Sequence, residues 1–308
     1  MPLLSGAGCT RRSTSTTGTS PRSHDRERAL RHSGHARSDA QAPIFSVCGT
    51  QRLLRGRRGG AVGYSFAEVT VVRHGLSAAN IAFAEAEAAG RAETGITGRD
   101  VDVPLSPFGR AQAAALGRGL AARPPIMRRP EVVVCSPYQR ARETWEIAAT
   151  TAEATGLRLP EPVVDDRLGD RLMGRLELLT SAAIADRFPA EVERSRAAGP
   201  FAYRPPGGES FGDIAVRLTS LLEDLDRRYP GRRMFLVAHD AVVIMMRYVI
   251  ESLSFDDLAA MVAEGPVINA AITRFAHDGD RLTLVEYNAA THLSDPAQPH
   301  RAPPPRDR

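Results

Sequence analysis

The sequence contains no lysine, because all 40 of its basic residues are arginines. This absence excludes Schiff-base catalysis and nucleotide binding through a P-loop lysine, since both depend on a lysine amine. Long hydrophobic runs are missing as well. The longest, residues 241–250, is interrupted by Arg247 and is shorter than the ~18 residues that a membrane span needs. The N-terminus has no apolar segment of the secretory-signal type, so we expect no membrane segment.

Cysteines are few and scattered. The three, at positions 9, 48 and 135, lie far apart and lack the spacing of metal ligands. A disulfide framework is therefore not expected, and the chain is expected in a reducing compartment, the cytoplasm. His, Asp and Glu form no cluster in the sequence that demands a metal ion, so we expect neither a metal nor a cofactor.

The charges are distributed unevenly, and their distribution predicts three parts. Residues 1–63 carry 11 Arg against 3 acids in a Ser-, Thr- and Gly-rich composition, which predicts a disordered extension. Residues 295–308 are proline-rich and predict a second disordered tail. Residues 64–294 hold 26 Arg and 31 acids and are long enough for one domain with a substantial core. Nucleic-acid binding by this acidic domain is not expected, and tethering of RNA by the basic extension is a weaker alternative.

Three short apolar runs predict buried strands that end in polar residues. They are Val69–Val72 before Arg73-His74-Gly75, Val132–Cys135 before Ser136 and Arg140, and Met234–Ala238 before His239. Helical patterns separate these strands, which predicts an α/β fold: a three-layer α/β/α domain around a mainly parallel, twisted sheet. The carboxyl ends of neighbouring strands in such a sheet meet at the ligand crevice, so we expect the polar residues to converge there.

The remaining segments give weaker signals. Residues 267–275 and 282–287 predict two strands of a hairpin, joined by the turn Asp278-Gly279. Residues 94–103 are rich in Gly and Asp and predict a loop. Residues 194–208 are expected to be irregular.

Arg73 and His74 at a strand end suit phosphoryl transfer. A neutral imidazole, with an ordinary pKa of about 6.5, is a good nucleophile near neutral pH. A guanidinium is always charged and offers a planar fork of donors to phosphoryl oxygens. A chance Arg-His pair explains the tripeptide equally well, so the interpretation depends on partners elsewhere in the chain.

Four separated segments supply such partners and resemble the histidine phosphatase superfamily, in its phosphoglycerate mutase-like branch. The segments are Arg73-His-Gly-x-Ser-x-x-Asn80, Asp102-x-Pro-Leu-Ser-x-x-Gly109-x-x-Gln112, Cys135-Ser-Pro-x-x-Arg140-Ala-x-x-Thr144 and Val237-Ala-His239. The resemblance covers roughly residues 66–290. Two more segments, Leu168-Gly-Asp170-x-x-x-Gly174-x-x-Glu177 and Pro206-Gly-Gly-Glu-Ser210, are similar to the bisphosphatase domain that acts on fructose 2,6-bisphosphate.

The resemblance implies a role for each matching residue. His74 is the nucleophile that forms a phosphohistidine, and Arg73, Arg140 and His239 hold the phosphoryl oxygens. Asp170 stands where the family usually has Glu and is the implied general acid and base. Glu177 and Asp166 are the competing candidates for that role. The family uses no metal.

Other implied contacts have a structural alternative. Asn80 is a polar contact to the phosphoryl group or a helix cap. Glu209 and Ser210 orient the site or cap the following helix. Arg196 and Arg204 bind a second anionic group of the substrate or are solvated loop charges.

The sequence therefore predicts a phosphomonoester hydrolase that acts through phosphohistidine on a small phosphorylated metabolite. Fructose 2,6-bisphosphate is not expected, because Ser181, Pro200, Phe211 and Ile244 replace the Tyr, Lys, Tyr and Arg of the resembling bisphosphatase. One alternative is a phosphoglycerate mutase, an isomerase using the same site. Another is a catalytically weak module that binds a phosphorylated ligand, because Asp240 stands where many relatives have Gly. A homodimer is an open alternative for the assembly.

Overall fold

The structure, a computed structural model, describes residues 63–122 and 129–293. Residues 1–62 of the expected extension and the whole proline-rich tail, 295–308, lie outside the described residues. Within these residues, no helix has the length and apolar character that crossing a bilayer requires.

The described strands form one mixed sheet, in the order β3-β2-β4-β1-β5-β6. Its parallel strands are β1 (Glu68–Arg73), β2 (Val132–Cys135), β3 (Pro162–Val164) and β4 (Arg233–Ala238), and its antiparallel strands are β5 (Ile272–His277) and β6 (Leu282–Ala289). The mainly parallel sheet and the C-terminal hairpin are confirmed. Valines predominate in β1 and β2, as expected of strands that are covered on both faces.

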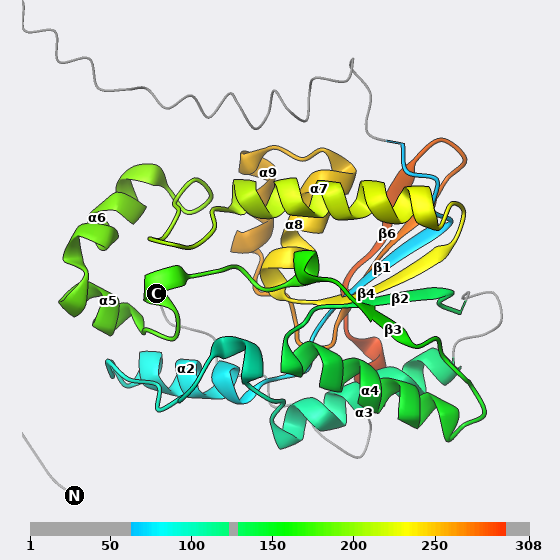
Figure 1. Cartoon of the computed structure of the whole chain (residues 1–308), viewed down its shortest axis with the longest axis horizontal. Helices are drawn as coiled ribbons and strands as arrows, with labels where there is room; N and C mark the ends of the chain where they lie inside the picture. The colour runs from blue at the N-terminus through cyan, green and yellow to red at the C-terminus, as the bar shows by residue number, and fades with distance from the viewer. Residues whose placement is uncertain (1–62, 123–128, 294–308) are drawn as a thin grey trace, which may run out of the picture. The chain divides into compact units, whose positions relative to one another are not determined.

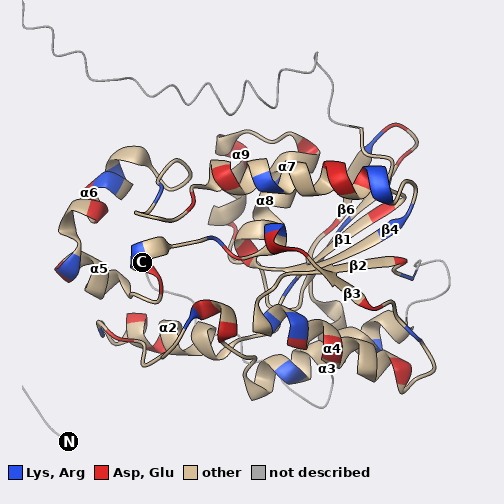
Figure 2. Cartoon of the chain, in the orientation of Figure 1, with Lys and Arg blue, Asp and Glu red and all other residues tan. Residues whose placement is uncertain are grey.

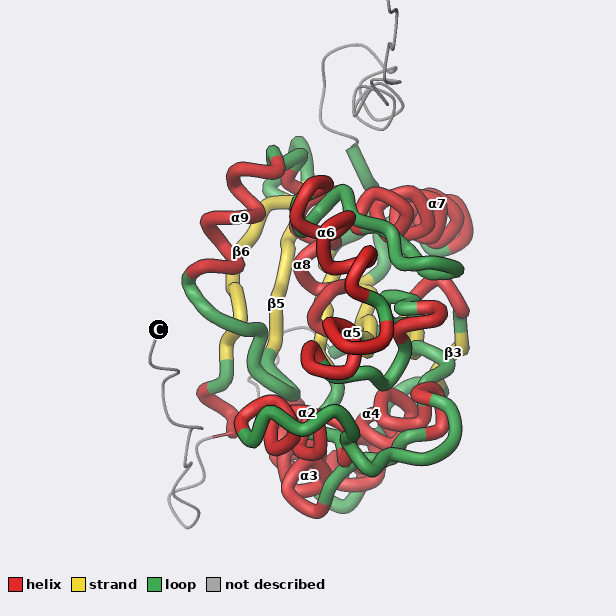
Figure 3. Tube along the Cα trace, turned by 90° about the vertical axis from the view of Figure 1, so that its left-hand side faces the viewer, coloured by secondary structure: helices red, strands yellow, loops and turns green. Residues whose placement is uncertain are grey.

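Helices cover both faces of the sheet and its carboxyl edge. Helices α3 (Pro107–Ala122) and α4 (Gln139–Glu153) cover one face, and α7 (Phe211–Arg228), α8 (Asp240–Glu251) and α9 (Phe255–Ala263) cover the other (Figure 1). Helices α2 (Ala78–Ala88), α5 (Ser181–Arg187) and α6 (Pro189–Ala198) lie beyond the carboxyl ends of the parallel strands (Figures 1 and 3). Four short 3₁₀ turns are described: η1 (Asp100–Asp102), η2 (Asp166–Leu168), η3 (Gly174–Leu176) and η4 (Thr291–Leu293). The predicted three-layer α/β/α fold is confirmed.

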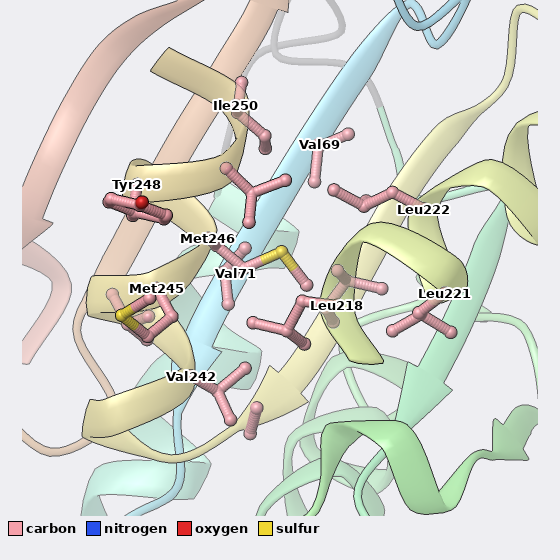
Figure 4. Close-up of a cluster of buried hydrophobic side chains, with 14 of the residues drawn as sticks. Val69, Val71, Leu218, Leu221, Leu222, Val242, Met245, Met246, Tyr248 and Ile250 are labelled. Atoms are coloured by element: carbon pink, nitrogen blue, oxygen red, sulfur yellow. The ribbon is translucent and has the colours of Figure 1, made fainter. Parts of the chain in front are cut away.

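Two hydrophobic clusters hold the central strands in place. In the larger, Val69 and Val71 of β1 pack with Leu218 of α7 and Met246 of α8 (Figure 4). On the opposite face, the other cluster includes Trp145 of α4. Burial of one such side chain is worth about 1.5–3 kcal/mol. The strands that carry the functional residues are therefore anchored from both sides.

The expectation for residues 194–208 is wrong in part, because α6 continues to Ala198. The helix starts with Pro189 at its first turn, has no buried residue and lacks an apolar stripe. Its Arg194–Glu191 and Arg196–Glu193 ion pairs join residues three positions apart. Figure 2 shows acidic and basic residues along the helix. Such a helix gives no hydrophobic periodicity to read, which explains the error.

Candidate active site

The three predicted strand ends are neighbours, because β4 lies between β2 and β1. Arg73 pairs with Ala238 and Cys135 pairs with Val237, so the strands end at the same level. The next residues along the chain are His74, Ser136 and His239, and all three are buried. The expected convergence of the strand ends is confirmed.

The imidazole of His74 is held in its neutral form. Its Nδ1 lies 2.7 Å from the Gly75 carbonyl oxygen, which only accepts hydrogen bonds, so Nδ1 carries the proton. The lone pair is then on Nε2, where it accepts a 3.2 Å hydrogen bond from Arg140 Nε. Burial, followed by the charges of His239, Arg140 and Arg73, lowers the pKa of His74 well below its usual range. His74 is therefore a neutral imidazole at neutral pH, with the proton on Nδ1 and none on Nε2.

Close backbone packing fixes the loop that follows His74. A Cβ atom at Gly75 would lie 2.5 Å from the Gly109 carbonyl oxygen, and one at Gly109 would lie 2.1 Å from the Leu76 oxygen. Only glycine fits at both positions. The Leu76 amide also donates a 2.8 Å hydrogen bond to Gln112 Oε1. The Gly109 and Gln112 of the second family-like segment thus position the His74 loop.

Arg73 has donor capacity that the protein leaves unused. One terminal nitrogen donates to the Val267 carbonyl oxygen, and the other lies 3.6 Å from Asp240 Oδ2. Its Nε is buried and has no hydrogen-bond partner among the described residues. A buried guanidinium donor without a partner suits an anionic ligand such as a phosphoryl oxygen.

His239 joins the strand end of β2 to the candidate acid. Its Nε2 lies 2.8 Å from Ser136 Oγ. Its Nδ1 lies 3.2 Å from Asp170 Oδ2, an ion-pair distance without hydrogen-bond alignment. The rings of His74 and His239 meet edge to face, with centroids 5.1 Å apart. The geometry places a second imidazole beside that of His74.

Asp170 lies in the site, in contact with Arg140 and His239. Its Oδ2 accepts a 2.9 Å hydrogen bond from Arg140, and its Oδ1 accepts one of 2.8 Å from the Arg171 amide. Burial alone would raise the pKa of the carboxyl. The nearby His239, Arg140 and His74 outweigh burial and hold that pKa well below its usual range. Asp170 is therefore a carboxylate in the folded protein. In this form it can act as a general base, and it can act as a general acid only after it has gained a proton.

Glycine contacts explain the two segments that resemble the bisphosphatase domain. A Cβ atom at Gly174 would lie 2.3 Å from the Pro206 oxygen, and one at Gly208 would lie 2.3 Å from the Leu172 oxygen. The two segments therefore pack backbone against backbone, which fixes the loop that carries Asp170.

Glu209 and Ser210 act within this packing. Glu209 pairs with Arg217 at 3.0 Å and accepts a 3.2 Å hydrogen bond from the Leu172 amide. Ser210 forms the capping box of α7 with Asp213. Both residues support the loop and the helix, and neither lines the cavity described next.

A cavity of about 330 Å³ opens beside Arg140, Asp170 and Tyr138, the residues that contact the two histidines. Neither histidine is itself among the lining residues. Its lining residues are Ser77, Ala79, Asn80, Phe83, Asp100, Tyr138, Arg140, Asp170, Arg171, Met173, Glu177, Leu178, Phe211, Asp240 and Ala241. Asn80 and Glu177 thus face the candidate site, and Asp166 does not line it. A further hollow of about 420 Å³, between β3 and α7, shares no lining residue with this cavity.

Asn80 and the two outer arginines have structural roles. The amide oxygen of Asn80 completes the capping box of α2 with Ser77. Arg196 pairs with Glu193 and is exposed, and Arg204 pairs with Asp213. Neither arginine lines the cavity, so the structure does not bring them to the site.

Two residues in the cavity were missed by the sequence analysis. Asp100 pairs with Arg140 at 2.9 Å, and the Tyr138 ring packs edge to face on His239 with centroids 4.8 Å apart. Tyr138 lies inside the segment Cys135 to Arg140, but the matching pattern leaves that position open. Asp100 lies 40 positions from its partner, in a loop without periodicity, so no local signal pointed to it.

Metal ligands do not gather at the site. Within the part of the chain that the structure describes, no group of three or more His, Cys, Asp or Glu side chains could hold a metal ion. The side-chain donors around His74 are instead guanidinium and imidazole groups, which suit an anion.

Comparisons with known proteins agree with this geometry. The sequence profile of the histidine phosphatase superfamily (branch 1) matches residues 69–290. The metal-independent phosphoserine phosphatase of Arabidopsis thaliana is 27% identical over 228 residues, which span 74% of this chain and 83% of that protein. A 2,3-bisphosphoglycerate-dependent phosphoglycerate mutase of Gloeobacter violaceus is 30% identical over 158 residues, which span 48% of this chain and 58% of the mutase.

A solved structure extends the comparison to the fold. The mycobacterial glucosyl-3-phosphoglycerate phosphatase in complex with VO₃ superimposes with a TM-score of 0.54 at 28% identity, over 72% of this chain and 99% of that one. Because the profile covers the strand ends and both histidines, the chain belongs to the histidine phosphatase superfamily.

Proposed function

We propose that the protein is a phosphomonoester hydrolase that works through a phosphohistidine at His74. The observation that carries the proposal is the lone pair of His74 Nε2, held on a buried, neutral ring beside Arg140. Arg73 and His239 lie beside it, each with a buried side-chain nitrogen that has no hydrogen-bond partner among the described residues and that could bind a phosphoryl oxygen. The phosphatase relatives described above support the same reaction class.

In the first step, His74 Nε2 attacks phosphorus and the bond to the ester oxygen breaks. Arginine donors stabilise the charge on the equatorial oxygens. Asp170 supplies a proton to the leaving oxygen, and the bound phosphate dianion opposes the charges that otherwise lower the pKa of this carboxyl. In the second step, water attacks phosphorus, Asp170 takes its proton, the N–P bond breaks and inorganic phosphate leaves.

The charge of the cavity favours hydrolysis over the mutase reaction. A mutase must hold a second phosphate. The cationic side chains of the cavity lining are Arg140 and Arg171, whereas Asp100, Asp170, Glu177 and Asp240 are acidic. Arg171 already donates to the carbonyl oxygens of Glu209 and Tyr203. A second phosphate therefore meets more negative than positive charge, and water is the better acceptor.

The decisive experiment combines a substrate panel with trapping of the intermediate. Purified protein should release phosphate from small phosphate esters and should not convert 3-phosphoglycerate into 2-phosphoglycerate. Acid-labile, base-stable label should accumulate from a ³²P-labelled ester. His74→Ala should abolish both turnover and label, and His277→Ala, on the far hairpin, should change neither. A labelled His74→Ala protein, or isomerisation without phosphate release, would contradict the proposal.

A binding module is the second candidate, and the position of Asp240 favours it. The Asp240 carboxylate lies 3.6 Å from Arg73 and accepts a 2.8 Å hydrogen bond from the Ala241 amide. It therefore partly neutralises the charge of Arg73, which the proposed reaction uses to bind phosphoryl oxygens. Tight binding of a phosphate ester without turnover, measured on the same panel, would select this candidate.

We also propose that residues 64–294 alone form the catalytic domain, in a cytoplasmic protein. The described core begins at Tyr64 and ends at Leu293, which supports the first point. Removal of residues 1–63 should leave kcat and KM unchanged. A truncated protein that folds but loses turnover would show that the extension takes part in catalysis.

A further inference from the structure

All five N–H donors of Arg140 are used by the protein itself. The Nε donates to His74 Nε2 at 3.2 Å. One terminal nitrogen donates to the Asp100 carbonyl oxygen at 2.8 Å and to Asp100 Oδ1 at 3.0 Å. The other donates to Asp100 Oδ2 and to Asp170 Oδ2, both at 2.9 Å. A guanidinium has only five N–H groups, so none remains for a phosphoryl oxygen.

Asp100 binds the Arg140 guanidinium in the same arrangement that a phosphoryl group would use. Both of its carboxylate oxygens accept from the two terminal nitrogens, which is the bidentate arrangement that guanidinium groups form with carboxylates and phosphates alike. The Arg140 side chain is only 4% exposed, whereas that of Asp100 is 21% exposed. Of the two partners, Asp100 is the one that can leave towards solvent.

A phosphoryl group on His74 Nε2 must lie against Arg140, because the two side chains are already in hydrogen-bond contact. The oxygens of the phosphoryl group are negatively charged, like the Asp100 carboxylate, and they need the same N–H donors of Arg140. We propose that Asp100 is a specificity-determining residue, an internal competitor that occupies Arg140 until a phosphorylated ligand displaces it. This inference rests on the proposed function and concerns the affinity of the same site.

The attachment of Asp100 allows displacement without loss of the core. Asp100 belongs to the short turn η1, and its amide donates one 3.2 Å hydrogen bond to Glu177 Oε1. Upstream, Gly95 and Gly98 have positive φ angles and open space where a side chain would stand. The segment is therefore held at Arg140 and Glu177 and is not packed around these glycines.

The test compares two variants of the same turn in the full chain. Asp100→Asn removes the competing charge. Asp102→Asn is the matched control, since Asp102 is 58% exposed and pairs with Arg99, itself 76% exposed. The probes are inorganic phosphate and orthovanadate, as competitive inhibitors of p-nitrophenyl phosphate hydrolysis.

In Asp100→Asn, both inhibition constants and the KM should fall by about tenfold or more, the equivalent of one charge-assisted hydrogen bond, with kcat nearly unchanged. Asp102→Asn should leave all of these constants as they are. Unchanged inhibition constants in Asp100→Asn, or a lower kcat with a higher KM, would overturn the inference and make Asp100 a support for Arg140. If the unmodified protein does not hydrolyse p-nitrophenyl phosphate, that result would instead contradict the proposed function.

Amide hydrogen exchange on the unmodified protein decides the matter if Asp100→Asn does not fold. The amides of Asp102 and Val103 donate to the Arg99 and Asp100 carbonyl oxygens at 3.1 and 3.2 Å. Saturating vanadate should speed exchange of these two amides, although bound ligands ordinarily slow exchange around their sites. Slower or unchanged exchange would overturn the inference.

Discussion

The Gly75 amide donates a 3.0 Å hydrogen bond to Thr144 Oγ1, which joins the loop after His74 to helix α4. The same hydroxyl donates to the Arg140 carbonyl oxygen at 2.7 Å. Thr144 is fully buried. One side chain thus sets the position of His74 relative to Arg140.

Replacement of Thr144 by valine should therefore damage both stability and catalysis. The shape is kept, but the buried Gly75 amide loses its acceptor, which costs about 1–3 kcal/mol. Chemical denaturation should show this loss, and kcat should fall because the His74 loop is less constrained. The matched control is Thr151→Val on the same helix, whose hydroxyl bonds only the Ile147 carbonyl oxygen. Equal effects of both variants would show that the Gly75 contact has no special importance.

The contact between Gly75 and Thr144 also shows which features of the site could be predicted from the sequence and which could not. Short apolar runs and the residues after them predicted β1, β2 and β4, and the convergence of their ends followed from the rule for parallel sheets. The family-like segments marked His74, Arg140 and Thr144 as important. They did not show that Thr144 holds the Gly75 amide, because patterns along the chain carry no information on side-chain partners.

Other features of the site lay beyond the sequence for a similar reason. Asp100 belongs to the site only because it pairs with Arg140. The two residues are 40 positions apart, and no periodicity in the sequence connects them. The role of Glu209 depends on backbone contact between two glycine-containing segments. Helix α6 was misread because ion pairs and not an apolar stripe accompany it.

The low pKa of His74 should make folding stability depend on pH below neutrality. The pKa is lowered in the folded state, by burial first, and is about 6.5 in the unfolded chain. Between the two values the unfolded chain binds more protons, so stability decreases as the pH falls below about 6.5. The slope from this one group approaches about 1.4 kcal/mol per pH unit.

Urea denaturation between pH 5 and 7.5 would measure this dependence. In His74→Ala the slope should be shallower by about that amount, because the buried titrating group is gone. The lowered pKa of Asp170 contributes separately, through stability that is lost as the pH falls below the ordinary Asp value of about 3.9. A variant with the wild-type slope would show that His74 is protonated as easily in the folded protein as in the unfolded chain.

Chelators should not affect turnover, and vanadate should inhibit it. Arg73, Arg140 and His239 neutralise the phosphoryl oxygens in the proposed reaction, which is the task a metal ion performs in other phosphatases. Vanadate should bind because its trigonal-bipyramidal adduct with His74 resembles the transition state. Initial rates with and without EDTA and with added Mg²⁺ test the first point. Strict dependence of turnover on Mg²⁺ would contradict the proposal that these side chains act in place of a metal ion.

The last prediction concerns Asp170 as the proton donor. The position of its carboxyl, between Arg140 and His239, is suitable, but its pKa in the unliganded protein is too low for it to hold a proton. An acid at this position must gain its proton together with the phosphorylated substrate. The kcat/KM for an alkyl phosphate should therefore decline as the pH rises through neutrality, since ever fewer complexes form with this proton in place.

Asp170→Asn separates the acid role from a structural one. The variant should lose about 10²–10⁴-fold in kcat with an alkyl phosphate, the usual contribution of general acid catalysis. It should lose much less with p-nitrophenyl phosphate, because a nitrophenolate leaves without needing a proton. Asp166→Asn, outside the cavity, should affect neither substrate. Equal losses on both substrates in Asp170→Asn would make Asp170 a support for Arg140. The same comparison with Glu177→Gln, whose side chain lines the cavity, would then identify the donor.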